Sequence, residues 1–153
     1  IEVGERYRIL AEEVGVEFSL EVEDACPWAY SNADRIEQVL VILLDNAIKF
    51  TPEGKCVSIR AKWDDEKIYV SVADEGAGIS AVDLPRLFER FYKSDKARSG
   101  MGTGLGLSIA HEVLEKLDEN IWVETQEGNG STFTFTLKRL ERRETPENDG
   151  MPC

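Results

Sequence analysis

Two pairs of strands joined by short turns restrict the fold more than any other feature of the sequence. Residues 56–63 and 67–73 alternate apolar and polar side chains and are separated by a tight turn. Residues 121–125 and 131–137 flank Gly128-Asn129-Gly130, which is a strong hairpin signal. Because hairpin-linked strands run antiparallel, the sequence predicts a mixed or antiparallel sheet.

The remaining elements predict a layer of helices on this sheet. Ser31 and Asp34 give an S-x-x-D start signal for a helix that ends near Phe50. Ser80 and Asp83 give a second start signal, and the residues that follow it carry apolar side chains at helical spacing. Those side chains are Leu84, Leu87, Phe88 and Phe91. A short helix over 5–14, a strand over 16–22 and a helix over 105–117 complete the prediction. We therefore expect an α/β two-layer sandwich, with a mixed, largely antiparallel sheet covered on one face by helices.

Length and charge limit the domain organisation and the partners. The 153 residues favour one domain over 16–140, preceded by a helical stub (1–15) from an absent N-terminal helical domain and followed by a charged, disordered tail (141–153). The formal net charge of −12 argues against nucleic acid as a partner, because phosphate neutralisation needs clustered Lys and Arg. The three widely spaced cysteines fit a reducing cytoplasmic setting. The sequence has no run of about 18 apolar residues, so we expect a cytoplasmic domain that makes no membrane contact itself.

Alternating glycines point to a phosphate-binding backbone. Gly102, Gly104 and Gly106 follow a polar loop over 93–104 and precede a helix, and a loop of that length in a compact domain is typical of a lid or binding loop. A Walker loop is excluded, because no Gly-Lys-Ser or Gly-Lys-Thr occurs. Gly76-x-Gly78 begins a dinucleotide fingerprint, but no strand with an acidic residue follows at the required distance.

Five separated boxes, taken in order, resemble one family. They are "DNAIKF" (45–50), "DEGAGI" (74–79), "FERFYK" (88–93), "GTGLGL" (102–107) and "GNGSTF" (128–133). Their order, spacing and wording resemble the ATP-binding catalytic domain of sensor histidine kinases, over about residues 16–137. These domains have the Bergerat fold, shared with DNA gyrase, the mismatch-repair ATPases and a large chaperone family. The resemblance implies ATP and Mg²⁺ as cofactors.

The resemblance implies that the first two boxes, residues 45–50 and 74–79, contain the residues that contact the metal ion, the phosphates and the adenine base. Asn46 matches the magnesium ligand, and its amide oxygen is a hard donor suited to that ion. Lys49 lies three residues further along the same helix, where its charge faces the phosphates. Asp74 matches the residue that accepts from the adenine amine, because a carboxylate is acceptor-only. Gly76 and Gly78 would let the backbone pass beside the purine.

The remaining nucleotide contacts fall on the predicted lid and on the glycine segment. Tyr92 and Lys93 match positions that reach the phosphates. The glycine segment would hold the phosphates on bare backbone at a helix N-terminus. Its residues are Gly102, Thr103, Gly104, Leu105 and Gly106. The last box, with Gly128, Gly130 and Ser131, would shape the pocket floor.

Two departures from related sequences bear on the activity. Hydrolytic relatives carry a Glu four residues before the metal-binding Asn, whereas this chain has Ile42, which cannot activate water. Histidine kinases usually have Asn there, so this position also departs from the family that the boxes resemble. The single histidine, His111, is outside any acceptor motif.

The resemblance therefore implies a kinase domain that presents Mg-ATP to a His on a separate dimerisation and acceptor domain. A response regulator would then receive the phosphoryl group. Two alternatives stay open. One is a Ser kinase of the anti-sigma type, with the same fold. The other is a nucleotide-sensing interaction module without transfer activity, for which Ile42 is the best support.

Overall fold

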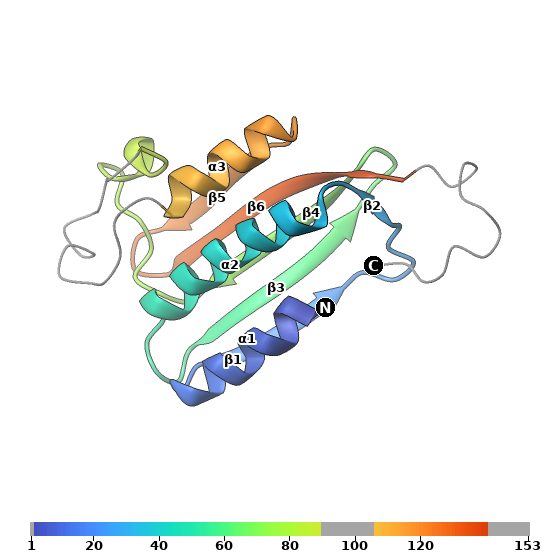
Figure 1. Ribbon diagram of the computed structural model, residues 1–153. Coiled ribbons are helices and arrows are strands. Elements are labelled where there is room, and N and C mark those ends of the chain that lie inside the picture. Colours follow the sequence, from blue (N-terminus) through green and yellow to red (C-terminus); the bar gives the residue numbers. More distant parts are fainter. Residues whose placement is uncertain (1, 90–105, 141–153) are drawn as a thin grey trace.

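The computed structural model describes residues 2–89 and 106–140 (Figure 1). The helices are α1 (Glu2–Glu13), α2 (Ala33–Phe50) and α3 (Gly106–Lys116), with a 3₁₀ helix at Leu84–Arg86. The strands are β1 (Glu17–Val22), β2 (Ala29–Tyr30), β3 (Cys56–Trp63), β4 (Lys67–Asp74), β5 (Ile121–Gln126) and β6 (Gly130–Arg139). The strand pairs predicted from the two short turns are β3–β4 and β5–β6, and both are confirmed.

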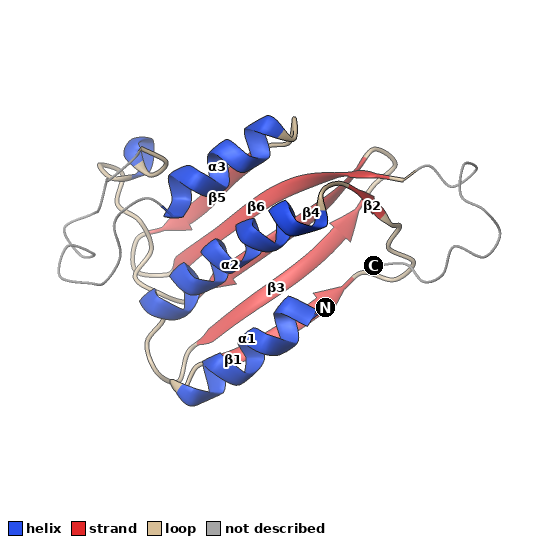
Figure 2. Cartoon of the chain, viewed as in Figure 1, coloured by secondary structure: helices blue, strands red, loops and turns tan. Residues whose placement is uncertain are grey.

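The six strands form one mixed sheet in the order β1-β3-β4-β6-β2, and β5 also pairs with β6. The β1–β3 pair is parallel, and the other four pairs are antiparallel. The helices α1, α2 and α3 lie across one face of this sheet (Figure 2). The predicted two-layer sandwich with a largely antiparallel sheet is therefore confirmed.

The core lies between the helices and the sheet. Its largest fully buried side chains are Phe135, Leu43, Leu44 and Leu114, contributed by β6, α2 and α3. Helix α1 belongs to the same core, since its buried face includes Val3, Tyr7 and Ala11. The Tyr7 hydroxyl donates to Asp45 Oδ1 at 2.7 Å, and burial together with this bond raises the Tyr7 pKa above its ordinary value. Residues 2–13 thus pack on the sheet, whereas their link to a further helical domain stays a prediction.

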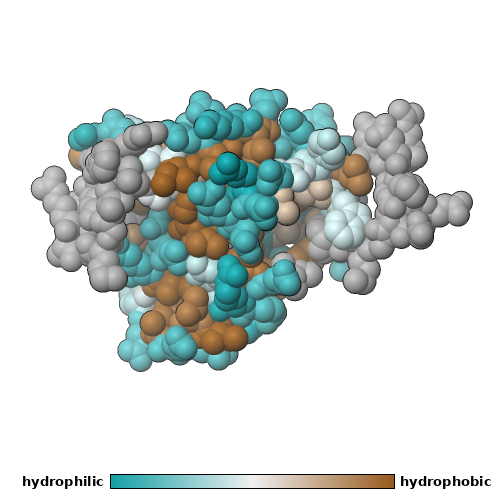
Figure 3. All heavy atoms as spheres, viewed as in Figure 1, coloured by the Kyte–Doolittle hydropathy of each residue, from teal (hydrophilic) through white to brown (hydrophobic). Residues whose placement is uncertain are grey.

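Apolar side chains also reach the surface on the helical side. Figure 3 shows them between the polar surfaces of the helices. On α1 and just beyond it, Ile9, Leu10 and Val14 are exposed. In the part of the chain that is described, none of the helices is long and apolar enough to cross a lipid bilayer.

Three details of the sequence prediction were wrong or incomplete. The cap of α2 is Asn32, not Ser31, because the Asn32 side chain accepts from the Arg35 backbone N–H at 3.1 Å. The two-residue strand β2 was not predicted, since it is too short to show a period.

The helix predicted from the Ser80 and Asp83 signal is only a 3₁₀ turn within the described residues. The signal itself forms, with Ser80 Oγ donating to Asp83 Oδ2 at 2.9 Å. Pro85 then lacks the N–H that would continue an α-helical ladder, and it disfavours α geometry at Leu84. The half-buried Phe88 nevertheless packs against the core.

A buried carboxylate connects the end of α3 to the sheet. Glu119 is almost fully buried and accepts from Lys67 Nζ at 2.6 Å, Thr136 Oγ1 at 2.8 Å and the Lys138 backbone N–H at 2.8 Å. These contacts tie the α3–β5 connection to both β4 and β6. Removing the carboxylate leaves all three donors without their shared acceptor.

We expect Glu119→Ala to lower the free energy of unfolding by about 3 kcal/mol, because it breaks a buried ion pair whose lysine is only partly exposed. Urea denaturation measures the change. The control is Glu124→Ala on the neighbouring strand, where an exposed carboxylate should contribute less than about 0.5 kcal/mol. Equal losses in the two variants would contradict the role assigned to Glu119.

Candidate active site

Four chain segments converge at one end of the molecule. The C-terminal end of α2, the N-terminus of α3, the end of β4 and the β5–β6 turn all lie there (Figure 1). These segments carry every predicted site residue that falls within the described part of the chain. The structure thus brings predicted residues as far apart in sequence as Asn46 and Gly106 to the same end of the molecule, and their roles at a common site stay a prediction.

Helix α2 is the common wall of this site. Gly106, at the start of α3, packs against it so closely that an added Cβ would lie 3.4 Å from Ile42 Cγ2. A Cβ added at Gly76, beyond β4, would lie 2.6 Å from the Phe50 carbonyl oxygen. Asn46 stands one turn from both Ile42 and Phe50, on the same side of the helix. The glycine segment's last residue and the Asp74–Gly76 turn thus flank the same stretch of α2.

Asn46 presents a free amide between these two contacts. Its side chain is half-buried, and it makes no hydrogen bond within the described residues. Its amide atoms are reachable from solvent, so they are available to a ligand. Lys49 is exposed one turn further on, with Nζ 5.2 Å from the Phe50 ring centroid. Both side chains can therefore reach a polyanion at this end of α2.

Asp74 is a partly buried acceptor held by backbone groups. Its Oδ1 accepts from the Gly76 N–H at 2.9 Å, and the Ser131 backbone N–H also favours the ionised carboxylate and lowers its pKa. Burial raises the pKa of Asp74, and these two donors oppose the rise without cancelling it. The register explains the arrangement, because Asp74 stands directly opposite Ser131 in the β4–β6 pair.

The turn after Asp74 is pressed against the β5–β6 hairpin. The Gly128 N–H donates to the Ala77 carbonyl at 2.6 Å. Gly78 has a φ of +75°, and an added Cβ would lie 2.4 Å from the Gln126 carbonyl oxygen. Gly76 and Gly78 are therefore required by backbone-to-backbone packing within the protein, which differs from the reason expected from the sequence. Their contact with a purine stays a prediction.

Several predicted site residues lie outside the described residues, and their roles stay predictions. They are Tyr92, Lys93, Gly102, Thr103, Gly104 and Leu105. Gly106 is described as the first residue of α3. Sequence reasoning also missed Thr125, whose hydroxyl binds the end of the Asp74 turn at Ile79. Thr125 stands opposite Ser131 in the β5–β6 hairpin, and only this register would have pointed to it.

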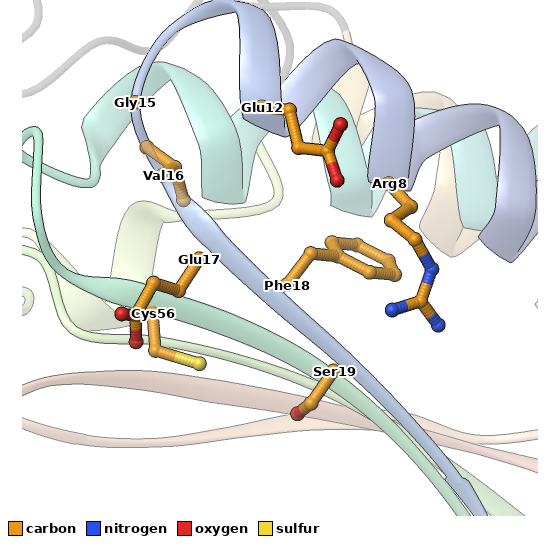
Figure 4. Close-up of a pocket in the computed structure, with 8 residues that line it drawn as sticks. All are labelled: Arg8, Glu12, Gly15, Val16, Glu17, Phe18, Ser19 and Cys56. Carbon is orange, nitrogen blue, oxygen red and sulfur yellow. The ribbon is translucent and has the colours of Figure 1, made fainter.

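A hollow lies elsewhere on the molecule, between α1, β1 and the start of β3 (Figure 4). It has a volume of about 540 Å³ and is lined by Arg8, Glu12, Phe18 and Cys56, among others. Burial raises the pKa of the Cys56 thiol, which therefore favours its neutral form. None of the predicted site residues lines this hollow, so it is separate from the group around Asp74.

The fold and the converging boxes define a nucleotide-binding domain of the Bergerat type. Residues 31–141 match the family model for the histidine kinase-, DNA gyrase B-, and HSP90-like ATPases, and the chain belongs to this family. It is 42% identical over 139 residues to the sensor histidine kinase WalK of Bacillus subtilis, which covers 88% of this chain and 23% of WalK. It is 35% identical over 137 residues to the adaptive-response sensory kinase SasA of a Nostoc species. This match covers 89% of this chain and 33% of SasA.

Solved structures agree with this family. The mycobacterial sensor histidine kinase MprB superposes with a TM-score of 0.77 at 28% identity, covering 90% of this chain and 94% of that one. Full-length ShkA in complex with AMPPNP superposes with a TM-score of 0.81 at 30% identity. The match covers 91% of this chain and 29% of ShkA. The chain thus corresponds to the catalytic ATP-binding domain of sensor histidine kinases. It spans about a quarter to a third of the two curated relatives named above.

Proposed function

We propose that this domain holds Mg-ATP at the end of α2 for transfer of the γ-phosphoryl group to a histidine on a separate helical domain. One observation carries the proposal. The Asp74 turn and the start of α3 flank the same stretch of α2, and the free Asn46 amide lies between them. A site with a base acceptor at one end and a metal ligand beside it fits a nucleoside triphosphate.

The Asp74 carboxylate would select adenine. An ionised carboxylate accepts hydrogen bonds only, so it pairs with the exocyclic amine of adenine. Guanine has a carbonyl oxygen at the corresponding position, and two facing acceptors repel. Partial burial strengthens this discrimination, since an unpaired carboxylate in such a position is unfavourable.

Asn46 and Lys49 would act at the phosphate end. The Asn46 amide oxygen suits Mg²⁺, which usually takes few protein ligands and keeps several waters. Once bound, the ion would neutralise charge on the phosphate oxygens. Lys49 adds a mobile positive charge, and the first N–H groups of α3 favour an anion near Gly106. Together they supply a local positive potential at this end of an acidic chain.

Transfer to a side chain fits the residues better than hydrolysis does. Ile42 stands where hydrolytic relatives have a glutamate, and an alkyl group cannot deprotonate water. The nucleophile would therefore come from another domain. His111 is unsuited to that role, because its ring stacks on Phe88 with the centroids 5.2 Å apart and Nδ1 lies 3.8 Å from Glu115. A response regulator would act downstream, in the cytoplasm.

Transfer of labelled phosphate from ATP to a matching acceptor domain tests this function. The proposal predicts label in the acid-labile bond that phosphohistidine forms. Acid-stable label on serine would favour the Ser-kinase alternative. Nucleotide binding without any transfer would favour a sensing module, for which the Ile42 substitution is the supporting observation.

Asn46→Asp should slow magnesium-dependent transfer by at least about tenfold, because it adds a negative charge beside the phosphates and alters the metal ligand. Binding of metal-free nucleotide should change far less. Labelled transfer and calorimetry, each with and without Mg²⁺, give the two readouts. Asn120→Asp, at an exposed position between α3 and β5, is the matched control. Full transfer activity in Asn46→Asp would remove Asn46 from the metal site.

A further inference from the structure

We propose that Thr125 is a positioning residue whose hydroxyl fixes the Asp74 turn and so sets the affinity for the adenine base. The proposal rests on the proposed function, because it concerns the same site. It adds a residue on β5 that lies outside the five sequence boxes. Thr125 contacts the protein rather than the nucleotide, so its effect would pass through Asp74.

The Thr125 hydroxyl has a complete set of partners. Its Oγ1 accepts from the Ile79 N–H at 2.9 Å and lies 3.1 Å from the Gly130 carbonyl oxygen, to which it donates. It also lies 2.9 Å from Ser131 Oγ. A hydroxyl has one proton and two acceptor sites, so Ser131 must be the donor in that last bond. All of the hydrogen-bonding capacity of Thr125 is thus used between the turn and the hairpin.

These contacts hold the two ends of the turn together. Ile79 is at its far end, and Ser131 stands directly opposite Asp74 at its near end in the β4–β6 pair. Thr125 joins Ile79 to Ser131 through a single oxygen atom. The hairpin therefore acts as a template for the turn, and displacement of Ile79 or Ser131 would move the Asp74 carboxylate.

The role of the hairpin in holding the turn can be tested at Thr125, because a substitution there can remove the hydroxyl and keep the shape of the side chain. The contact between Gly128 and Ala77 is made by backbone groups, which a side-chain substitution does not remove. Valine has the shape and the strand preference of threonine but lacks the hydroxyl. Thr125→Val therefore leaves the Ile79 N–H and Ser131 Oγ without this partner. Thr125→Ser retains it.

The chain contains a matched control on the same hairpin. Thr134 Oγ1 lies 2.9 Å from Ser71 Oγ, which is the same kind of hydroxyl pair at the same distance. Phe133 and Phe135 point into the core beneath the helices, so Thr134 between them faces the opposite side of the sheet. Thr134→Val thus removes a comparable hydrogen bond on the other face of the sheet, three residue pairs along from Asp74 and Ser131.

Calorimetric titration with ATP and with ADP tests the proposal. Thr125→Val should raise both dissociation constants by the same factor, about tenfold, because the effect lies at the base and not at the phosphates. Thr125→Ser and Thr134→Val should each stay within about threefold of the wild type. Hydrogen exchange at the Ile79 amide should accelerate in Thr125→Val and stay unchanged in Thr134→Val.

The outcomes separate this inference from the proposed function. If the wild type binds ATP, Asp74→Asn weakens binding and Thr125→Val does not, then the role of Thr125 is overturned while the function stands. If the wild type binds no adenine nucleotide, the proposed function fails. In the Asp74→Asn background, Thr125→Val should cause little further loss, because both act on one contact. Additive losses would show that Thr125 acts independently of Asp74.

Discussion

Asp74→Asn should weaken ATP binding by about 100-fold, since it replaces the charged acceptor that we propose for the adenine amine with an amide that can present a donor. The folded structure should be affected little, because the Asn oxygen can still accept from the Gly76 N–H. We expect the free energy of unfolding at neutral pH to change by less than about 1 kcal/mol. Calorimetry and urea denaturation measure the two quantities.

The difference in stability between the wild type and Asp74→Asn should depend on pH in a defined direction. Because burial raises the Asp74 pKa, the folded state binds this proton more tightly than the unfolded state. Wild-type stability should therefore increase relative to Asp74→Asn as the pH falls through the raised pKa, and the gain is complete below the ordinary Asp pKa. Asp65→Asn, in the exposed β3–β4 turn, is the control. Unchanged ATP affinity in Asp74→Asn would refute the adenine contact.

Gly78→Ala should be the most destabilising of the glycine substitutions proposed here, lowering the free energy of unfolding by about 3 kcal/mol or more. The added Cβ would collide with the Gln126 carbonyl at 2.4 Å, in addition to the strain of a φ of +75°. The collision would also displace the Asp74 turn. ATP binding should therefore fall together with stability.

Gly54→Ala is the matched control for this prediction. Gly54 also has a positive φ, of +89°, but an added Cβ meets nothing within 4 Å. Gly54→Ala should lower the free energy of unfolding only by the conformational penalty of a positive φ, about 1–2 kcal/mol. Urea denaturation of the two variants then isolates the steric part. Equal losses would mean that the hairpin yields to the added methyl group and does not hold the turn.

The parts of the fold that could be predicted are those with a long period or a strong turn signal. The hairpins and α3 were found within one or two residues, because their alternation or helical spacing continues over many positions. The helix expected after Ser80 failed, since apolar spacing does not reveal how Pro85 interrupts the ladder. Strand β2 exists only because Ala29 and Tyr30 pair with the end of β6.

The same contrast applies to the site. Asp74 could be proposed from sequence, because it ends a strand and precedes two glycines in a recognisable box, and its role stays a prediction. Thr125 could not, since its partner Ile79 is 46 positions away and they meet only through the β5–β6 register. The need for a glycine at position 76 also depends on tertiary packing, because the backbone there lies against the Phe50 carbonyl at the end of α2.

The most direct test is to map amide chemical-shift changes on the labelled domain during titration with Mg²⁺ and AMPPNP. We predict that, in the described part of the chain, the largest changes fall on the end of α2 from Asn46, on residues 74–79 and on the first turn of α3. The hollow of Figure 4 should be unaffected. Changes confined to the residues around Cys56 and Phe18, or no changes at any of these positions, would contradict this prediction.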